Sequence, residues 1–265
     1  MTHYFSDIPQ STRPVKPRSS GATFIIDWGI GPVQQQDLLR SAAEFVDLAK
    51  IAVGIPGLLP AKILDEKVQI YQQHQVHPFP GGQFLEHAYV HGYDDAYLPA
   101  VQEAGFNWVE VSDNLTDVLL TWKAEMIHRA VNNFGMQVMG EVGKKAGGEG
   151  GTAFVDDART CRDAGAAYIL LEAAELVSND PEVQRDIDAV VDVIGLEQVM
   201  FELPGPWIEG VHACDIHTMR RQLISDYGPN VNIGNCDPTD LINLEAYRRK
   251  LGANAGGKTC QHGFE

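Results

Sequence analysis

Short apolar runs recur along the chain at an almost even interval, beginning at residue 23. Most of them are apolar at consecutive positions, which is typical of strands in a parallel sheet, because helices cover both faces of such a sheet. We therefore expect eight buried parallel strands. Their sequences are TFIIDW from Thr23, FVDLAKIAV from Phe45, QVHPF from Gln75, NWVEVS from Asn107, MQVMGEV from Met136, AYILLEA from Ala167, QVMFEL from Gln198 and NVNIG from Asn230.

The segments between these runs carry apolar residues three and four positions apart, a spacing that predicts amphipathic helices. The clearest helical segments are DLLRSAAEF, AKILDEKVQIYQQH, DAYLPAVQEAG, WKAEMIHRAVNNFG, FVDDARTCRDAG and EVQRDIDAVVDVIG. Several of them end in a glycine, which commonly terminates a helix because it adopts a positive φ without steric cost. These glycines are Gly105, Gly135, Gly165 and Gly195.

The interval between the strands indicates the architecture. After the first two runs, the strands start roughly 30 residues apart, which is about the length of one strand–helix unit. Eight such units without a break in composition predict a single (β/α)8 TIM barrel over residues 21–265, and the Pro- and Ser-rich residues 1–20 predict a short, flexible N-terminal arm. An open, doubly wound sheet is the alternative, but IDWGIGP after the first strand lacks the G-x-G-x-x-G of that fold.

The charge balance restricts the possible partners. The chain has 20 Lys and Arg residues against 36 Asp and Glu residues, a formal net charge of −16. Because nucleic acids and anionic membranes bind clustered cations, we expect neither as a partner. No segment approaches the ~20 apolar residues of a membrane span, and the N-terminus lacks the apolar core of a secretory signal. The four cysteines never form C-x-x-C, which favours free thiols and a cytoplasmic protein.

Four glutamates occupy equivalent places near the ends of the fourth to seventh predicted strands: Glu110, Glu141, Glu172 and Glu202, at intervals of 31, 31 and 30 residues. Each lies in an apolar run, where an ionised carboxylate is costly unless it is paired or bound to a cation. In a barrel, the carboxyl ends of the strands form the mouth that contains the active site. We therefore expect these four carboxylates to bind Mg²⁺. Buried ion pairs inside the barrel are the alternative interpretation.

Three lysines could balance these carboxylates. Lys50 interrupts the second apolar run, where a buried lysine requires an acidic partner or an anionic ligand. Lys144 and Lys145 follow the fifth strand directly in GEVGKKAGG. If the extended backbone continues that far, Lys145 points to the same side as Glu141. A lysine at this place could donate a proton or bind a phosphate, and a solvated basic loop is the alternative.

Two glycine-containing turns suggest contacts with an anionic substrate. PGGQFLEHA places Gly81 and Gly82 after the third strand, at the start of a helix whose free N–H groups could bind a phosphate or a carboxylate. NVNIGN places Gly234 and Asn235 near the face of the seventh and eighth strands, which often binds phosphate in barrels. We expect Gly81, Gly82, Asn232 and Gly234 to bind the substrate. A tight turn is the default explanation of either motif taken alone.

The segments KPRSSGATFIID, PGGQFLEHA, GFNWVEVSD, GEVGKK, DAGAAYILLE, VMFE and GPNVNIGN, followed by LEAYRRKLG, stand in this order along the chain. In this order they resemble the phosphosulfolactate synthase family, most specifically in GEVGKK and PGG-x-x-x-E. The resemblance extends from about Lys16 to Lys258. It implies a (β/α)8 barrel that depends on Mg²⁺ and adds sulfite to phosphoenolpyruvate. The product is (2R)-phospho-3-sulfolactate, made in the opening step of coenzyme M biosynthesis.

The resemblance also implies a mechanism and a set of roles. Sulfite attacks the methylene carbon of phosphoenolpyruvate and pushes charge into the carboxylate as an enediolate, which a metal held by the glutamates stabilises. Lys145 is the first choice for the donor of a proton to the α-carbon, with Lys144 as the alternative. Lys50 binds substrate oxyanions. We also expect a small anionic substrate and a homo-oligomer.

The chain departs from the family pattern at two places. Asp27-Trp28-Gly29 stands where the family usually has D-K-G, and Glu172-Ala173-Ala174-Glu175-Leu176 stands where it usually has E-G-R-E-S. Both changes remove a cation from the barrel mouth. The region DIDAVVDVIGLEQVMFE and the later YGPNVN resemble the plant heat-stress-associated branch of the superfamily. Two alternatives therefore stay open, which are a related lyase acting on a different enol or 2-oxo acid and a non-catalytic, stress-associated interaction protein.

Overall fold

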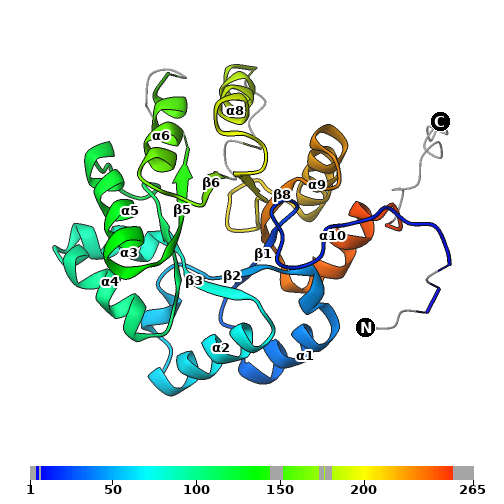
Figure 1. Ribbon diagram of the computed structural model, residues 1–265, viewed down its shortest axis with the longest axis horizontal. Helices are drawn as coiled ribbons and strands as arrows, with labels where there is room; N and C mark the ends of the chain where they lie inside the picture. Colours follow the sequence, from blue (N-terminus) through cyan, green and yellow to red (C-terminus); the bar gives the residue numbers. More distant parts are fainter. Residues whose placement is uncertain (1–3, 6, 144–151, 173–175, 177–180, 253–265) are drawn as a thin grey trace.

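Eight parallel strands form one sheet that curves into a nearly closed barrel, with helices around its outside (Figure 1). The computed structural model describes residues 4–5, 7–143, 152–172, 176 and 181–252. Each strand overlaps the apolar run that predicted it, so the expected (β/α)8 TIM barrel is confirmed. The strands are β1 (Thr23–Asp27), β2 (Leu48–Ile51), β3 (His77–Pro80), β4 (Trp108–Val111), β5 (Gln137–Val142), β6 (Tyr168–Leu171), β7 (Val199–Glu202) and β8 (Asn232–Cys236).

Helices connect the strands, and two of them, α3 and α4, lie between β3 and β4. The predicted helix-ending glycines Gly105, Gly135, Gly165 and Gly195 all have a positive φ, between 65° and 107°. A residue with a β-carbon rarely adopts this conformation, so glycine ends these helices for a steric reason. The helices are α1 (Pro32–Ala42), α2 (Ala61–Gln73), α3 (Gly82–Val90), α4 (Asp94–Glu103), α5 (Leu120–Phe134), α6 (Thr152–Asp163), α8 (Pro181–Ile194), α9 (Ala213–Tyr227) and α10 (Leu241–Arg248).

The strand order around the barrel is β3-β2-β1-β8-β7-β6-β5-β4. The two ends of this order, β3 and β4, also pack against each other. The register between β1 and β8 shifts by one residue, because Thr23 pairs with Ile233 whereas Ile25 pairs with Cys236. Such a bulge re-aims the side chains that follow it. Asn235 lies in the shifted part and has a φ of 53°.

Alternation along the strands produces two apolar cores. Inside the barrel, Phe24, Phe79, Met139 and Met200 form a small core, in which the rings of Phe24 and Phe79 meet edge to face at 5.4 Å. A larger core of mainly aliphatic side chains fills the space between the strands and the helices. Gly234 belongs to the interior packing, since a β-carbon there would lie 2.2 Å from the ring of Phe24. Its place in β8 therefore has a packing explanation.

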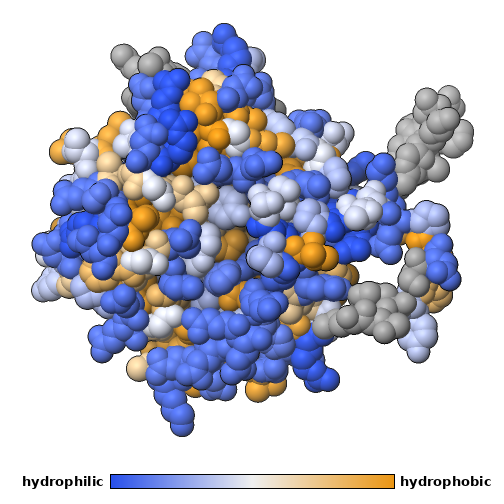
Figure 2. All heavy atoms as spheres, in the orientation of Figure 1, coloured by the Kyte–Doolittle hydropathy of each residue, from blue (hydrophilic) through white to orange (hydrophobic). Residues whose placement is uncertain are grey.

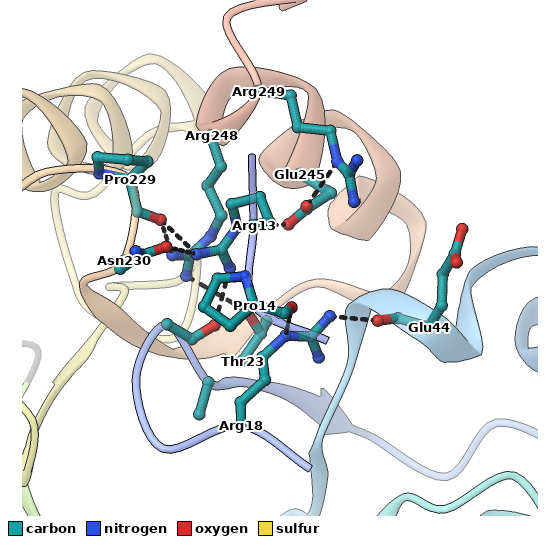
Figure 3. A network of polar contacts seen from close by, with 12 residues as sticks. Arg13, Pro14, Arg18, Thr23, Glu44, Pro229, Asn230, Glu245, Arg248 and Arg249 are labelled. Atoms are coloured by element: carbon teal, nitrogen blue, oxygen red, sulfur yellow. Dashed lines mark hydrogen bonds and ion pairs between the residues drawn. The ribbon is translucent and has the colours of Figure 1, made fainter. Parts of the chain in front are cut away.

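The N-terminal arm is attached to the amino end of the barrel by two arginines (Figure 3). Arg13 donates hydrogen bonds to the carbonyl oxygens of Pro229 and Gly21, at 2.7 and 2.8 Å, and forms an ion pair with Glu245 at 3.3 Å. Arg18 forms an ion pair with Asp47 at 2.8 Å. From Arg13 onward the arm thus packs on the barrel, and the boundary that we predicted at residue 20 stays a prediction.

The polar residues of the predicted amphipathic helices lie on the outer faces of the helices. Hydrophilic residues cover much of the surface over α1 and α2 (Figure 2), while the inner faces of these helices contribute Leu39, Leu64 and Val68 to the core. Among the described helices, none is both long enough and apolar enough to cross a membrane.

Candidate active site

A cavity of about 360 Å³ opens at the carboxyl ends of the strands, where the fold places the mouth of the barrel. All four predicted glutamates and Lys50 line it. Because the glutamates are spaced by about one strand–helix unit, they lie at the same end of the barrel. The described lining residues are Ile26, Trp28, Lys50, Ala52, Val53, Gly81, Gly82, Gln83, Glu110, Asn114, Glu141, Glu172, Glu202, Trp207 and Asn235.

Lys50 is paired with two of the carboxylates. Its Nζ lies 2.9 Å from Glu110 Oε2 and 2.6 Å from Glu202 Oε1, and all three side chains are almost completely buried. The other oxygen of Glu110 accepts a hydrogen bond from the amide of Gly82 at 3.0 Å. Both carboxylate oxygens of Glu110 are therefore engaged by the protein itself, which separates this glutamate from the other three.

Glu141, Glu172 and Glu202 each offer an oxygen to one place, with the three atoms within 4.8 Å of one another. Glu141 Oε2 is buried and has no hydrogen-bond partner within the part of the chain that the structure describes. A buried carboxylate oxygen without a partner is costly, and a divalent cation is the partner that fits three converging carboxylates. The residues present thus fit a Mg²⁺ ion. The sequence predicted all four glutamates as metal ligands; this assignment stays a prediction, and Glu110 lies outside the group of three that converge.

Burial and the close packing of several carboxyl groups shift pKa values in the cavity. Burial, together with the charges of Glu202, Glu172 and Glu110, raises the pKa of Glu141 well above its ordinary value. Burial also raises the pKa of Glu202 to about 7, although Lys50 lies beside it. For Lys50 itself, burial would lower the pKa, but the surrounding carboxylates raise the pKa well above its ordinary value. Lys50 therefore stays charged, and the raised pKa values of Glu141 and Glu202 mean that these two carboxyl groups resist ionisation until a further cation is present.

Gly81 and Gly82 line the cavity, but their amides are used within the protein. The Gly81 amide donates to the carbonyl of Ile51 at 3.0 Å, and the Gly82 amide donates to Glu110. The absence of a side chain is required at Gly82, because a β-carbon would lie 2.3 Å from Ser112 Oγ. These glycines allow close approach of β3, β4 and α3, which differs from the anion contact that we expected.

Asn232 and Gly234 do not line the cavity. Asn232 begins β8 and so lies at the opposite end of the barrel, where its amide group donates to the carbonyl of Val199 at 2.9 Å and accepts from the amide of Ala22 at 2.9 Å. Our expectation treated NVNIG as the whole strand. Because β8 starts two residues later, Asn232 lies at the amino end of the strand, out of reach of a ligand at the mouth. At Gly234 the ring of Phe24 fills the space of a side chain, and its role in binding stays a prediction.

Asn235, which the sequence had placed near the face of the seventh and eighth strands, is buried in the mouth, and its Oδ1 has no hydrogen-bond partner among the described residues. Other cavity residues were missing from the predicted set. Asn114 donates from Nδ2 to Glu172 Oε2 at 2.7 Å. Trp28 and Trp207 are 46% and 43% exposed, and their rings pack at 5.2 Å. Trp28 was visible as a departure from the family pattern, but no periodic signal identifies Asn114 or Trp207, which lie in loops.

The two predicted proton donors, Lys144 and Lys145, lie outside the described residues. Their assignment as catalytic residues stays a prediction from the sequence. Among the described residues that line the cavity, Lys50 is the only lysine or arginine.

Residues 11–254 match the family model described as (2R)-phospho-3-sulfolactate synthase (ComA). The chain belongs to this family. It is 29% identical to a phosphosulfolactate synthase of Methanothermobacter thermautotrophicus, over 93% of this chain and 95% of that one. It is also 27% identical to the protein HEAT-STRESS-ASSOCIATED 32 of Arabidopsis thaliana, over 91% and 90% of the two chains. The family resemblance read from the sequence, including its plant branch, is confirmed.

Solved structures share the fold at much lower identity. A 3-hexulose-6-phosphate synthase from Salmonella typhimurium matches with a TM-score of 0.52 and 14% identity, over 86% of this chain and 97% of that one. A phosphonopyruvate hydrolase in complex with oxalate and Mg²⁺ matches with a TM-score of 0.52 and 13% identity, over 84% and 78%. At these identities the likeness shows the barrel fold alone.

Proposed function

We propose that this protein is a phosphosulfolactate synthase-like lyase that adds sulfite to phosphoenolpyruvate to give (2R)-phospho-3-sulfolactate. The observation that supports this most directly is the group formed by Glu141, Glu172 and Glu202, with one buried carboxylate oxygen that has no hydrogen-bond partner among the described residues. Membership of the ComA family supports a lyase of this type. Mg²⁺ as cofactor, the two substrates and the carbon–sulfur chemistry are all part of the proposal.

Glu141, Glu172 and Glu202 would hold the metal ion. Mg²⁺ bound there would supply the positive charge that stabilises the enediolate of the substrate carboxylate. Lys50 stays protonated and fixes Glu110 and Glu202 at 2.9 and 2.6 Å. It thereby keeps both carboxylates in place and lowers the charge that they present to an anionic substrate.

The reaction requires one bond to form and one proton to be delivered. The sulfur lone pair of sulfite forms the C–S bond at the methylene carbon, and the electrons of the C=C bond move into the carboxylate. We assign the proton that then reaches the α-carbon to Lys145, with Lys144 as the alternative. The lysine regains its proton from water, so no oxidant or further reactant is needed.

The direct test is an assay with phosphoenolpyruvate, sulfite and Mg²⁺ that follows the consumption of sulfite. We expect turnover that requires Mg²⁺ and that Glu141→Gln abolishes, while the folded state of the variant stays intact by circular dichroism. A wild-type protein that is folded but shows no heat of binding with Mg²⁺ or Mn²⁺ would refute the metal-dependent mechanism. That result would favour a non-catalytic role of the kind expected for a stress-associated protein.

A second candidate function is a related lyase on a different enol or 2-oxo acid. The observation that favours it is the Trp28–Trp207 pair on the cavity wall, because aromatic side chains bind apolar or planar groups better than phosphate. Lys50, the only cation of the described lining, is already bound to two carboxylates. A less anionic substrate would fit this wall.

Restoring the missing cations distinguishes the two candidates. The double variant Trp28→Lys/Ala174→Arg puts back the cations that the family pattern places at these two positions; Ala174 lies outside the described residues. If the protein has changed its substrate, wild type should bind Mg²⁺ without turning over phosphoenolpyruvate, and the double variant should bind phosphoenolpyruvate more tightly. If neither protein binds it, the synthase proposal fails. A cytoplasmic location and a homo-oligomer remain predictions from the sequence.

A further inference from the structure

Glu86, in the first turns of α3, is a buried carboxylate with no direct contact to the cavity, and it organises the loop after β4. It is 1% exposed. Its Oε1 accepts hydrogen bonds from the hydroxyl of Ser112 and from the amide of Asn114, the latter at 3.0 Å. Its Oε2 accepts from the amides of Leu115 and Thr116, at 2.6 and 3.0 Å. One carboxylate thus receives four donors from a single loop.

This arrangement fixes the backbone of the loop. Hydrogen bonds to an ionised carboxylate are shorter and stronger than those between neutral groups. Three amides from consecutive residues, 114 to 116, point at the same side chain, so the loop cannot turn away without losing several bonds together. The position of Asn114 is therefore set by Glu86.

Asn114 connects this loop to the candidate metal site. Its side-chain Nδ2 donates to Glu172 Oε2 at 2.7 Å, and the contact is exposed to solvent. An exposed hydrogen bond contributes little by itself, because water competes for both partners. It persists where the backbone that carries the donor is already held in place, as Glu86 holds it here. Glu172 is thus held through Oε2 by Asn114 while it offers an oxygen to the place shared with Glu141 and Glu202.

We infer that Glu86 is a positioning residue, which holds Asn114 against Glu172 and so presets this carboxylate for the metal site formed with Glu141 and Glu202. The inference rests on the proposed function as far as the metal is concerned. It also explains the spacing of PGG-x-x-x-E. Gly82 donates to Glu110 from the first residue of α3, and Glu86, one helical turn later, holds the loop that leads to Glu172.

The simpler explanation is that Glu86 only stabilises the fold. The two explanations differ in what happens at Glu172 and in how the effects of two variants combine. Glu86→Gln keeps the size of the side chain but replaces one acceptor oxygen with an amide donor that faces backbone N–H groups. Asn114→Ala removes the contact with Glu172 and leaves the backbone amides of the loop in place. Asp94→Asn is a matched control, because Asp94 accepts from the indole of Trp122 at 2.9 Å and does not line the cavity.

The first measurement is made without metal. Hydrogen exchange at the amides of residues 114–116 should become at least 10-fold faster in Glu86→Gln, and should be unchanged in Asn114→Ala and in Asp94→Asn. A crystal structure of metal-free Glu86→Gln should show Asn114 Nδ2 beyond hydrogen-bonding distance of Glu172. Survival of that contact, or unchanged exchange in the loop, would overturn the inference.

The second measurement is the affinity for Mg²⁺ by titration calorimetry. Loss of a residue that orients a metal ligand typically weakens metal binding about 10- to 100-fold, and we expect at least 10-fold for Glu86→Gln and for Asn114→Ala. The double variant should bind Mg²⁺ as weakly as Asn114→Ala alone, because both changes act through the same contact. Effects that add in full would overturn the inference. If wild type itself binds no Mg²⁺, the proposed function fails, whereas the metal-free exchange and contact still decide the role of Glu86.

Discussion

The two ends of the barrel differ in how their buried hydrogen-bond acceptors are paired. At the amino end, Arg13 donates hydrogen bonds from all three guanidinium nitrogens, and Asn232 uses both atoms of its amide group. At the mouth, Glu141 Oε2 and Asn235 Oδ1 are buried without a hydrogen-bond partner among the described residues. The acceptor of Asn232 is thus paired at the amino end, whereas these acceptors at the mouth are open; the unpartnered buried atom of Arg248 at the amino end, Nε, is a donor.

This difference separates residues that stabilise the fold from residues that bind a ligand. A buried polar atom without a partner costs about 1–3 kcal/mol, and such atoms in a native protein require an explanation. At the mouth, we explain the open acceptor atoms by a bound cation or substrate that becomes their partner. Substitutions at the amino end should therefore destabilise the protein and leave binding unchanged, and substitutions at the mouth should weaken binding without destabilising the protein.

The largest effect should come from Lys145→Ala. If Lys145 delivers the proton to the α-carbon, its loss should lower turnover of phosphoenolpyruvate and sulfite by roughly 10²–10⁴-fold, the usual range for removal of a general acid. The free energy of unfolding should stay the same within about 0.5 kcal/mol. Lys144→Ala is the matched control and should keep most of the turnover. The reverse ranking of the two variants would assign the proton to Lys144.

At the amino end, Asn232→Ala should destabilise the protein by about 2–4 kcal/mol, roughly a 30- to 700-fold change in the unfolding equilibrium. The variant leaves the amide of Ala22 and the carbonyl of Val199 buried without their partner. Urea unfolding measures the effect, and Asn243→Ala, at an exposed asparagine that donates to Asp240, is the control with little effect. A large loss of Mg²⁺ affinity in Asn232→Ala would break the comparison, because Asn232 lies at the end opposite the mouth.

Features that repeat with the strand–helix unit were predictable from the sequence. The four glutamates are spaced like the strands that carry them, so a correct strand period places Glu110, Glu141, Glu172 and Glu202 at one end of the barrel. Helix-ending glycines were predictable for the same reason, since a positive φ is a local requirement. Both predictions depend on backbone geometry that is the same in every unit.

Features that depend on irregular backbone were not predictable. The start of β8 at Asn232 puts this residue at the amino end of the barrel, away from a ligand at the mouth. Asn114 and Trp207 reach the cavity from loops, where no period relates sequence position to direction. The anchoring of Arg13 depends on carbonyl groups more than 200 residues away, such as that of Pro229, which no local pattern reveals.

Glu141→Gln should weaken Mg²⁺ binding about 10- to 100-fold and should stabilise the metal-free protein by about 1 kcal/mol. The pKa of Glu141 is raised in the folded state, so wild type loses stability as the pH rises above the ordinary carboxyl pKa of about 4.3. Glutamine removes this loss, so the gain should be near zero at about pH 4 and largest above neutrality. Thermal unfolding at several pH values measures it, and a destabilised variant at neutral pH would show that Glu141 serves the fold.

The smallest effect concerns the pH dependence of Mg²⁺ binding. Burial raises the pKa of Glu202 to about 7 and that of Glu141 well above its ordinary value, so metal-free protein at neutral pH keeps protons on this pair that the metal must displace. The affinity for Mg²⁺ should therefore rise with pH through neutrality, by at most ~10-fold per pH unit for each proton released. Lys50 does not contribute, because its raised pKa keeps it charged throughout this range.

Calorimetric titrations between about pH 6 and 8, in two buffers with different ionisation enthalpies, count the protons released on Mg²⁺ binding. Glu141→Gln should release fewer protons than wild type and show a shallower rise of affinity with pH, because one of the two titrating carboxyl groups is gone. Asn232→Ala should release the same number as wild type. An affinity that does not change over this range would mean that Glu141 and Glu202 are already ionised in the metal-free protein.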